Sequence, residues 1–463
     1  MSQTAFSSLK LHADLLHNLN SLGYLSMTEI QSQSLPPILA GKDVIAQGKT
    51  GSGKTAAFAL GLLEKLEAKR FQVQSLVLCP TRELADQVAK EIRTLARSLD
   101  NIKVLTLCGG TPLGPQTGSL EHGVHIIVGT PGRIEKHLSK GSLDLSHLKS
   151  LVLDEADRML EMGFQPSIDA IIEQTPEQRQ TLLFSATYPD QIKSVASRIM
   201  KDPVMAQVIS THEDSIIEQH FYKVDDNEQR LTALRLLLLQ HNADSTLVFC
   251  NTKLEVQDVA KQLLDYGFSV LALHGDLEQR DRDQTLLRFA NKSAAILVAT
   301  DVAARGLDID ALDLVINYHV ARDTEVHIHR IGRTGRAGST GVACSLYSDK
   351  ESYKIALLGD YLNRIISSET LPSYSLLNES PGQPKMVTLQ IDGGKKQKVR
   401  AGDILGALTG ENGITGKQVG KIHIFDNWAY VAIERNAAKP ALQKLSKGKL
   451  KGRSFRVRQL AST

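Results

Sequence analysis

Short apolar runs alternate with longer amphipathic stretches along most of the chain. In the first half, such runs occupy residues 44–46, 76–78, 104–107, 126–128, 151–153 and 181–184. A second series occupies residues 247–249, 270–273, 296–298, 314–316 and 342–344. Short apolar runs separated by helix-length stretches are typical of buried parallel strands joined by helices. The pattern therefore predicts two α/β domains in tandem, each built on a parallel sheet.

Two polar segments separate these series from each other and from the last part of the chain. Residues 210–215 are polar, and residues 371–384 are rich in Pro and Ser. We interpret both segments as interdomain linkers. The predicted domains are therefore 32–209, 216–370 and 385–463, and residues 1–31 precede the first of them.

The last predicted domain has a different order of elements. Strand-like segments lie near residues 386–391, 421–424, 430–433 and 455–457, and helix-like segments lie near 402–408 and 437–445. The order β-α-β-β-α-β favours an α+β domain similar to an RNA recognition motif. The aromatic segment with which that motif stacks bases is missing from the sequence, so we expect basic residues and shape to govern recognition.

Composition limits the class of protein. The 463 residues are 42% hydrophobic and 23% charged, which excludes disordered, collagen-like and disulfide-scaffold chains. No apolar run is long enough to span a membrane, and the first residues lack the pattern of a secretory signal, so we expect a cytosolic protein. Cys79, Cys108, Cys250 and Cys344 form no C-x-x-C pair, and we interpret them as reduced core residues.

Charge is distributed unevenly along the chain. Residues 385–463 hold 16 Lys and Arg against 5 Asp and Glu, and subtraction from the totals of 54 and 51 leaves 38 against 46 for the rest. A run of basic residues without an intervening acid includes Lys447, Lys449, Lys451 and Arg453. Such a run is typical of a surface that binds nucleic acid, although a solvated face with no ligand is the alternative.

One segment predicts a phosphate-binding loop. Residues 48–55 match the pattern G-x-x-x-x-G-K-[ST], follow a strand-like run and precede a helix-like stretch. Backbone N–H groups at such a loop and helix start point at phosphates. We expect Lys54 to neutralise the outer phosphates and the Thr55 hydroxyl to bind Mg²⁺. The other predicted nucleotide-binding residues of the loop are Gly48, Thr50, Gly51, Ser52 and Gly53.

An acidic segment supplies the second half of such a site. Asp154 and Glu155 come directly after the apolar run at 151–153. A carboxylate at the end of a buried strand can reach Mg²⁺, partly through water, and we assign that role to Asp154. We assign to Glu155 the orientation and deprotonation of the water that attacks the γ-phosphate.

These two segments belong to an ordered set that resembles the DEAD-box RNA helicase family. The set contains DEAD at 154–157, PTRELA at 80–85, GG at 109–110, TPGR at 130–133, SAT at 185–187, VFCNT at 248–252, ATDVAARGLDI at 299–309 and HRIGRTGR at 329–336. The resemblance spans residue 6 to about residue 370. It implies two RecA-like parallel-sheet domains, ATP and Mg²⁺ as cofactors, and RNA-stimulated ATP hydrolysis coupled to unwinding.

The same resemblance assigns an adenine-reading segment near the start of the chain. Residues 23–31 are similar to the family's Q motif, in which Gln31 reads the adenine edge and Tyr24 stacks on the base. A Gln amide offers one donor and one acceptor that pair with adenine, so ATP should be preferred over GTP. The sequence departs from the family at Met27, which stands in place of Pro, and at Gly48, which stands in place of Ala.

The second α/β domain has no phosphate-binding loop of its own. By resemblance, Arg333 and Arg336 act as arginine fingers at the γ-phosphate, so that hydrolysis depends on domain closure. Gly306 and Asp308 are expected near the nucleotide sugar in the same state. We expect Arg330, in contrast, to lie on a solvated loop.

The resemblance also implies an RNA surface that crosses both α/β domains and contacts sugar and phosphate rather than bases. The residues assigned to it are Arg82, Gly110, Thr130 and Arg133 in the first domain, and Thr252, Gly275, Gln279, Arg282 and Thr300 in the second. Ser185 and Thr187 are expected to couple the ATP and RNA sites. Closure would bend the bound strand and separate a duplex locally.

The final domain points to one subfamily. Residues 391–396 and 402–410, together with the chain length, resemble the bacterial DbpA subfamily of DEAD-box proteins. That resemblance implies 23S ribosomal RNA and particles of the assembling large (50S) ribosomal subunit as partners. We expect a monomer.

Other activities find less support in the sequence. A GTPase lacks its guanine-reading N-K-x-D segment here, a serine hydrolase lacks its G-x-S-x-G turn, and His327 and His329 have no partner set for zinc. One alternative stays open. The same residues would serve an ATP-timed clamp or annealing protein that binds RNA without productive unwinding.

Overall fold

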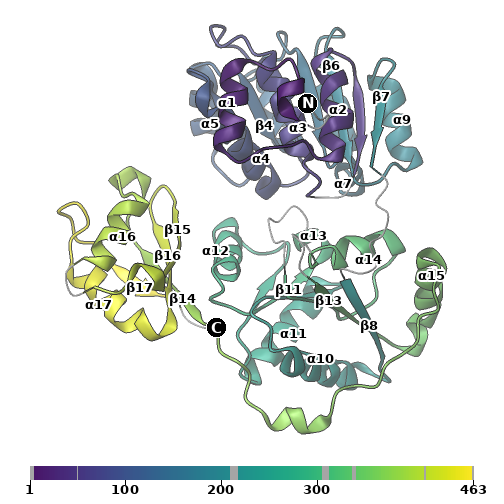
Figure 1. The fold of residues 1–463 in the computed structure, drawn as a ribbon, viewed down its shortest axis with the longest axis vertical. Coiled ribbons are helices and arrows are strands. Elements are labelled where there is room, and N and C mark those ends of the chain that lie inside the picture. Colours follow the sequence, from purple (N-terminus) through teal and green to yellow (C-terminus); the bar gives the residue numbers. More distant parts are fainter. Residues whose placement is uncertain are drawn as a thin grey trace. The chain divides into compact units, whose positions relative to one another are not determined.

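The computed structural model describes residues 5–48, 51–208, 217–304, 312–335, 340–410 and 413–460. These residues form two compact units, one within residues 1–212 and the other within 213–463 (Figure 1). The predicted linker at 210–215 lies outside the described residues.

The first unit is built on a sheet of seven parallel strands. The strands are β1 (Val44–Gln47), β2 (Ser75–Leu78), β3 (Val104–Leu107), β4 (Ile126–Gly129), β5 (Ser150–Asp154), β6 (Gln180–Ser185) and β7 (Val204–Gln207), in the order β3-β4-β2-β5-β6-β1-β7. Each of the six predicted runs is a strand. The sequence analysis missed β7, an edge strand that pairs with β1 and is partly exposed.

Helices cover both faces of this sheet. They are α1 (Ala13–Ser21), α2 (Glu29–Leu39), α3 (Lys54–Glu64), α4 (Arg82–Leu95), α5 (Leu113–Glu121), α6 (Pro131–Ser139), α7 (Ala156–Glu161), α8 (Gln165–Glu173) and α9 (Asp190–Ile199). Side chains alternate across a strand, so Val44 and Ala46 enter one apolar cluster, with α1 to α4, while Ile45 enters another, with α6, α8 and α9. Burial on both faces explains why the strands are continuous apolar runs.

The second unit contains a parallel sheet of six strands. They are β8 (Ile217–Lys223), β9 (Thr246–Cys250), β10 (Val270–Leu273), β11 (Ile296–Thr300), β12 (Leu314–Asn317) and β13 (Gly341–Tyr347), in the order β10-β11-β9-β12-β13-β8. Its helices are α10 (Asn227–His241), α11 (Lys253–Asp265), α12 (Gln279–Ala290), α13 (Asp301–Ala304), α14 (Thr324–Ile331) and α15 (Ser352–Leu362). The sequence analysis missed β8, because polar residues such as Gln219 and His220 interrupt its apolar pattern.

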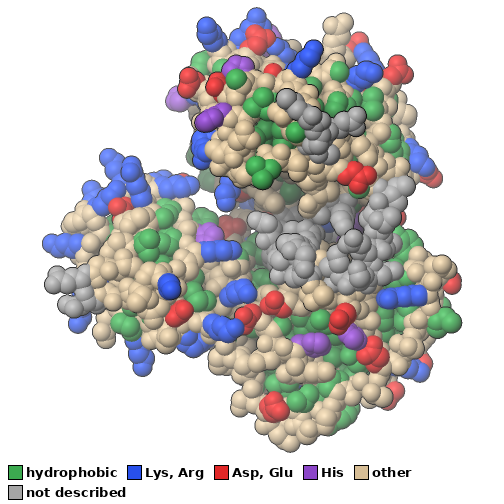
Figure 2. Space-filling model, viewed as in Figure 1, with side chains coloured by type: hydrophobic (Ala, Val, Ile, Leu, Met, Phe, Trp, Pro, Cys, Tyr) green, Lys and Arg blue, Asp and Glu red, His purple; other side chains and the backbone are tan. Residues whose placement is uncertain are grey.

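The same unit carries the predicted α+β domain. Its antiparallel strands are β14 (Met386–Ile391), β15 (Val419–Ile424), β16 (Ala429–Glu434) and β17 (Val457–Gln459), in the order β15-β16-β14-β17, and its helices are α16 (Ala401–Thr409) and α17 (Ala438–Lys447). The last strand begins two residues later than predicted, because its pairing with β14 starts at Val457, opposite Ile391. Lys and Arg side chains are spread over the visible face of this domain (Figure 2).

One face of this small sheet packs against its own helices, and the other is also buried. Val387 and Leu389 of β14 belong to the core under α16 and α17. Thr388, which alternates with them, contacts the segment after α12: its Oγ1 lies 2.8 Å from Ser293 Oγ and accepts from Asn291 Nδ2 at 3.3 Å. Tyr430 is 2% exposed on the same face as Thr388. The face that often stacks RNA bases in such sheets is thus covered here.

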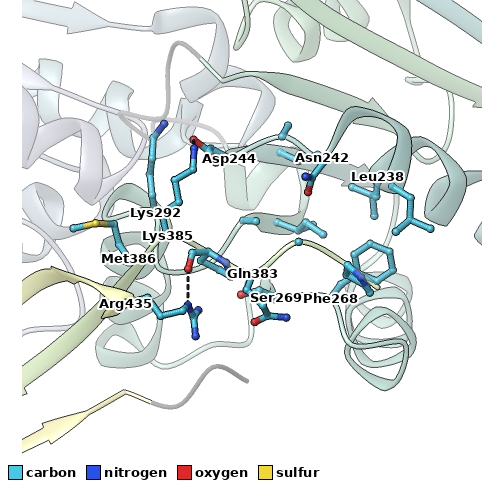
Figure 3. A pocket seen from close by; sticks show the side chains of 18 of the residues that line it. Leu238, Asn242, Asp244, Phe268, Ser269, Lys292, Gln383, Lys385, Met386 and Arg435 are labelled. Carbon is cyan, nitrogen blue, oxygen red and sulfur yellow. Dashed lines mark hydrogen bonds and ion pairs between the residues drawn. The ribbon is translucent and has the colours of Figure 1, made fainter. Parts of the chain in front are cut away.

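A cavity of about 880 Å³ lies beside this contact (Figure 3). Segments 381–386 and 434–436 line it together with the ends of α10 and the starts of β10 and β11. Lys385 Nζ pairs with Asp244 Oδ2 at 2.9 Å, and Arg435 Nε donates to the Pro384 carbonyl at 2.7 Å.

Among the helices that the structure describes, none has the length and apolar character needed to cross a bilayer.

The four cysteines are buried and free, as the sequence analysis expects. Cys79 follows β2, Cys108 follows β3, Cys250 ends β9 and Cys344 lies inside β13. Burial raises the pKa of each thiol, so these side chains behave as small apolar groups in the core.

Candidate ATP and RNA sites

The phosphate-binding loop lies between β1 and α3, in the predicted order strand, loop, helix. Gly51 and Gly53 have φ values of 82° and 93°, a left-handed conformation that favours glycine. A Cβ on Gly53 would lie 2.6 Å from Gln31 Nε2, so a larger residue would strain the backbone here and would have to displace the Gln31 amide. Thr50 lies outside the described residues.

Lys54 begins α3 and turns its ammonium back toward the loop. Its Nζ donates to the Gly48 carbonyl at 2.5 Å, and the residue is 7% exposed. Burial lowers the pKa of Lys54, and the nearby Asp154 and Glu155 carboxylates oppose that shift. The first N–H groups of a helix have no partner within it, so this end of α3 suits an anion.

Asp154 ends β5, beside the loop. The residue is 3% exposed, and its Oδ1 accepts from the Glu155 N–H at 3.0 Å. Burial, with help from the Glu155 charge, raises the pKa of Asp154 to about 7, although Lys54 acts in the opposite direction. A bound divalent cation would favour the ionised form of this carboxyl.

Glu155 has an unusual backbone. Its φ is 51° and its ψ is 51°, the left-handed conformation, which costs a non-glycine residue about 1 kcal/mol or more. The residue is 7% exposed, and its Oε2 accepts from Arg158 Nη1 at 2.9 Å. Backbone strain and a fixed carboxylate at the predicted base agree with a functional role for this position.

Asp157 joins the acidic segment to the segment after β6. Its Oδ2 accepts three hydrogen bonds, from the N–H of Ala186 at 3.2 Å and from the N–H and Oγ1 of Thr187, both at 3.0 Å. Burial acts to raise the pKa of Asp157, but the Thr187 hydrogen bonds and the Arg158 charge lower it. The Ser185 carbonyl in turn accepts from the Gly48 N–H at 3.1 Å. Movement of residues 185–187 would therefore displace both the phosphate loop and the acidic segment.

Gln31, the predicted adenine-reading residue, lies next to the loop. Gln31 Nε2 donates to the Gly53 carbonyl at 3.0 Å, and Gln31 Oε1 accepts from the Thr28 N–H at 2.9 Å. Thr28 Oγ1 donates to the Ser52 carbonyl at 2.8 Å. These hydrogen bonds connect the start of α2 to the phosphate loop, so a change in the position of one would move the other.

Tyr24, the predicted stacking ring, is held from two sides. Its hydroxyl donates to Glu91 Oε1 at 2.6 Å, and its ring lies edge-on to Phe6, with ring centres 6.3 Å apart. Burial and the Glu91 carboxylate raise the pKa of Tyr24 to about 12. Met27, where the family has Pro, is 6% exposed and packs in the core of the first unit.

Three of the predicted RNA residues of the first unit lie around the segment after β3. Gly110 has a φ of 70°, and a Cβ there would collide with the Arg82 guanidinium. Arg133 donates from Nη1 to Gln116 Oε1 at 2.9 Å and from Nη2 to the Thr111 carbonyl at 3.0 Å. The fourth, Thr130, precedes α6 as its N-cap. Two guanidinium groups and a bare glycine backbone offer donors to a phosphate.

The predicted RNA residues of the second unit lie at starts and ends of elements. Arg282 Nη2 donates to the Ala303 carbonyl at 2.8 Å, and Thr300 Oγ1 accepts from the Ala303 N–H at 3.3 Å, so these two meet at α13. Thr252 caps α11, and Gln279 Nε2 donates to Asp283 Oδ1 at 2.7 Å at the start of α12. Gly275 has open space beside it.

Arg330 is not on a solvated loop, and that expectation is wrong. The residue is 1% exposed in α14, and its Nε and Nη2 pair with the two carboxylate oxygens of Asp301, each at 2.7 Å. Its Nη1 donates to the His319 carbonyl at 2.8 Å. Asp301 is 29 positions away, so the partner that buries this arginine is invisible to local sequence patterns.

The predicted arginine fingers follow α14. Arg333 is 5% exposed and belongs to the second unit. Arg336 lies outside the described residues, as do Gly306 and Asp308. The predicted roles of all four toward the nucleotide stay predictions.

The basic run of the last domain lies on its surface. Lys447 ends α17, and Lys449, Lys451 and Arg453 follow it; all four are exposed. Lys451 Nζ pairs with Asp403 Oδ2 at 3.2 Å and donates to the Lys398 carbonyl, also at 3.2 Å. The run therefore adjoins the start of α16.

Mg²⁺ fits the residues of the ATP site. Within the described ranges, no group of three or more His, Cys, Asp and Glu side chains could hold a metal ion by itself. Mg²⁺ in nucleotide sites needs no such group, because waters and phosphates complete its six ligands. Thr55 and Asp154, which the sequence predicts as ligands, are hard oxygen donors on the loop side and the strand side of the site.

Sequence reasoning missed some residues that hold the site together. Arg158 pairs with Glu155, and Thr28 bonds the loop at Ser52. The spacing of three residues on a helix could have pointed to Arg158, since residues three apart lie on one face. No local signal connects Thr28 with Ser52, because the contact arises from the packing of α2 on α3.

Three protein families match the chain in consecutive segments. DEAD/DEAH box helicase matches residues 28–195, and the helicase conserved C-terminal domain matches residues 229–338. The DbpA RNA binding domain matches residues 388–459. The matched segments cover the ATP site, the arginine-rich segment around α14 and the small antiparallel sheet.

Relatives share this arrangement over their whole length. The chain is 54% identical over 458 residues to "ATP-dependent RNA helicase DbpA" of Escherichia coli (strain K12), covering 99% of this chain and 100% of that protein. A protein of the same name from Bacillus subtilis (strain 168) is 35% identical over 472 residues and 98% of each chain. The structure of S. cerevisiae Dbp5 bound to RNA and ADP BeF3 matches with a TM-score of 0.71 at 29% identity, covering 79% of this chain and 95% of that one.

Proposed function

The chain belongs to the DEAD-box family of ATP-dependent RNA helicases, in its DbpA group, and is an RNA-dependent ATPase; on that premise we propose that it remodels 23S ribosomal RNA during assembly of the large (50S) subunit. The observation that carries the proposal is the match to the DbpA RNA binding domain at residues 388–459. This match lies within residues 385–463, which hold 16 basic and 5 acidic residues. The helicase units would supply ATP-driven unwinding, and this domain would choose the site.

The ATP step begins with the phosphate loop. The backbone of Gly51 and Gly53, the start of α3 and the Lys54 ammonium bind the phosphates, and Gln31 and Tyr24 select adenine. Thr55 and Asp154 would hold Mg²⁺, which when bound neutralises charge on the phosphates. The buried position of Asp154 supports this role, because burial raises the pKa of its carboxyl and a bound cation would favour the ionised form.

Glu155 acts on the attacking water. Its carboxylate orients the water and takes one proton as the water oxygen bonds to the γ-phosphorus and the bond to ADP breaks. Arg333 and Arg336, from the second unit, stabilise the charge that develops on the transferred group. Because they come from the other unit, hydrolysis would require closure.

RNA binding would be coupled to the ATP site. Arg82, Gly110 and Arg133 would hold one stretch of RNA backbone, and Arg282 and Thr300 would hold another. The three hydrogen bonds from residues 186–187 to Asp157 support coupling, because they link the segment after β6 to the acidic segment. A bound strand bent by closure would leave its duplex partner.

The C-terminal domain would provide selectivity. Its exposed Lys447, Lys449, Lys451 and Arg453 favour a polyanion, and structured RNA is recognised largely by shape and backbone. Particles of the assembling large subunit would be the partner, the cytosol the location, and a monomer the acting form.

The first test is ATP hydrolysis at one fixed salt concentration with no RNA, with a homopolymer and with 23S rRNA. Salt must be held constant because RNA affinity can change by orders of magnitude with it. Strong stimulation by 23S rRNA and weak stimulation by the homopolymer is the expected result. Equal stimulation by both RNAs would contradict the assigned selectivity and leave the C-terminal domain a general RNA anchor.

A second test separates unwinding from clamping. A tailed duplex is mixed with excess protein and ATP, and strand release is followed in a single turnover. We expect release that needs hydrolysable ATP. A long-lived complex without release would instead support the ATP-timed clamp or annealing protein.

A further inference from the structure

Arg158 is a buried arginine that the proposed hydrolysis steps do not use. It lies in the first turn of α7, three residues after Glu155, and its side chain is 5% exposed. Its Nη1 donates to Glu155 Oε2 at 2.9 Å, and the Glu155 side chain is 9% exposed. A guanidinium is seldom buried without a function or a structural partner, and here the partner is the predicted general base.

The ion pair fixes one oxygen of Glu155 and leaves the other for chemistry. Oε2 is bonded to Arg158, and no hydrogen bond to Oε1 is present among the described residues. A general base needs one carboxylate oxygen directed at the water and a side chain that does not rotate away. The left-handed backbone of Glu155 also makes its direction depend on surrounding contacts.

Other charged groups of the site have different contacts. Lys54 donates to the Gly48 carbonyl, and Asp157 is bonded to residues 186–187. Asp154 accepts from the Glu155 backbone. Arg158 is therefore the described side chain that holds the Glu155 carboxylate.

We propose that Arg158 is a positioning residue for ATP hydrolysis, which holds Glu155 Oε2 so that Oε1 accepts the proton of the attacking water. This inference rests on the proposed role of Glu155. In this role Arg158 acts through Glu155 and not directly on ATP or the water. Its loss should slow turnover and leave nucleotide binding intact.

The test compares Arg158→Met, Arg158→Lys and Glu155→Gln in the full chain, with 23S rRNA and saturating ATP. A base displaced by about 1 Å can cost a hundredfold in rate, so we expect Arg158→Met to lower kcat by about that factor. The KM for ATP and the binding of a fluorescent ATP analogue should change less than about twofold, because the residues that bind ATP before the reaction are unchanged. Arg158→Lys should recover part of kcat, because an ammonium can still donate to Oε2.

A matched control removes an arginine from an ion pair elsewhere in the same unit. Arg198 pairs with Asp169 on the surface, so Arg198→Met should keep the wild-type kcat. Thermal unfolding of each variant shows whether the first unit still folds. Should Arg158→Met fail to fold, the double variant Glu155→Gln/Arg158→Met removes both charges and keeps the test usable.

The double variant also tells positioning from general damage. If Arg158 acts through Glu155, the double variant should hydrolyse ATP as slowly as Glu155→Gln alone. A wild-type kcat in Arg158→Met, or a double variant many times slower than Glu155→Gln, would overturn the inference. Wild-type turnover in Glu155→Gln would instead overturn the base assignment of the proposed function itself.

Discussion

Among single residues, burial separates charged groups that hold the fold from those that serve the surface. Arg330 is 1% exposed and meets both oxygens of Asp301, whereas Lys193 and Asp190 form an exposed pair one turn apart. A buried pair loses much when one partner is removed, since the other charge stays without compensation. An exposed pair is screened by water and contributes little.

We therefore expect Arg330→Met to destabilise the second unit by about 3 kcal/mol. Denaturant unfolding of the full chain, followed by a probe in the second unit, measures this. Lys253→Met, which breaks the exposed pair of Lys253 with Asp276 in the same unit, is the control and should leave the unfolding midpoint unchanged. Equal midpoints for Arg330→Met and the wild type would contradict the buried ion pair with Asp301.

Gly53 shows how a single backbone position controls ligand binding. Its φ of 93° opposes any side chain, and so does the distance of only 2.6 Å that would separate an added Cβ from Gln31 Nε2. Gly53→Ala should raise the KM for ATP by about tenfold or more, because about 1.4 kcal/mol of lost binding corresponds to tenfold. Gly114→Ala, where a Cβ meets open space, is the control. An unchanged KM in Gly53→Ala would show that the loop can relax around the extra methyl group.

Between helices and strands, a buried polar network joins β12, α10, α11 and the turn before α15. His319 follows β12, and its Nε2 contacts Glu255 Oε1 of α11 at 2.5 Å while its Nδ1 contacts Glu351 Oε1 at 3.3 Å. Arg230 of α10 pairs with Glu351 Oε2 at 2.6 Å. Burial alone would lower the pKa of His319, but the hydrogen bonds that its ring donates to the Glu255 and Glu351 carboxylates raise it.

This network predicts a pH dependence of stability. A histidine whose pKa is raised by folding stabilises the fold fully below its unfolded pKa, about 6.5, and loses that effect as pH rises through the folded pKa. The difference in melting temperature between the wild type and His319→Gln should therefore be largest below about pH 6.5 and shrink as the pH rises above that value. His327 has its pKa lowered to about 3 by burial and acts with the opposite sign, but it is common to both proteins and cancels in the difference. A difference that grows with pH would contradict the assignment.

Across the whole molecule, the proposed function divides chemistry and RNA selectivity between different parts of the chain. The ATP site lies in the first unit, while the positively charged small sheet belongs to the second. That sheet contacts the segment after α12 through Thr388, in the unit that also carries Arg333. Under the proposed function, RNA selectivity would therefore belong to a part of the chain that holds no predicted ATP-binding residue.

Deletion of residues 385–463 should leave a weak RNA-stimulated ATPase that does not distinguish RNAs. The ratio of kcat/KM with 23S rRNA to that with a homopolymer measures this and should fall to about one, since phosphate contacts alone carry no sequence information. A charge-reversed full chain with Lys447, Lys449 and Arg453 changed to Glu is the comparison that keeps the Thr388 contact. An undiminished preference for ribosomal RNA in both proteins would refute the assigned role of the domain.

Many local elements of this protein could be predicted from its sequence. The phosphate loop, the acidic segment after β5 and the apolar runs each depend on residues close together along the chain, and the structure contains the corresponding strands and helices. The family follows from the order of such segments. The sequence did not predict the edge strands β7 and β8, because partial exposure interrupts the apolar pattern that is typical of buried strands.

Packing in three dimensions selected which distant residues meet. Pairing of β5 with β6 brings Asp157 to Thr187. Packing of α14 near α13 brings Arg330 to Asp301, and contact of the small sheet with the segment after α12 brings Thr388 to Ser293. Burial then sets the pKa of Asp154 and changes Arg330 from an expected surface residue into a central one. The amino-acid order alone was therefore enough for the local elements and the chemistry they carry. The charge state and coupling of those groups came from packing, because both depend on what surrounds a side chain in space.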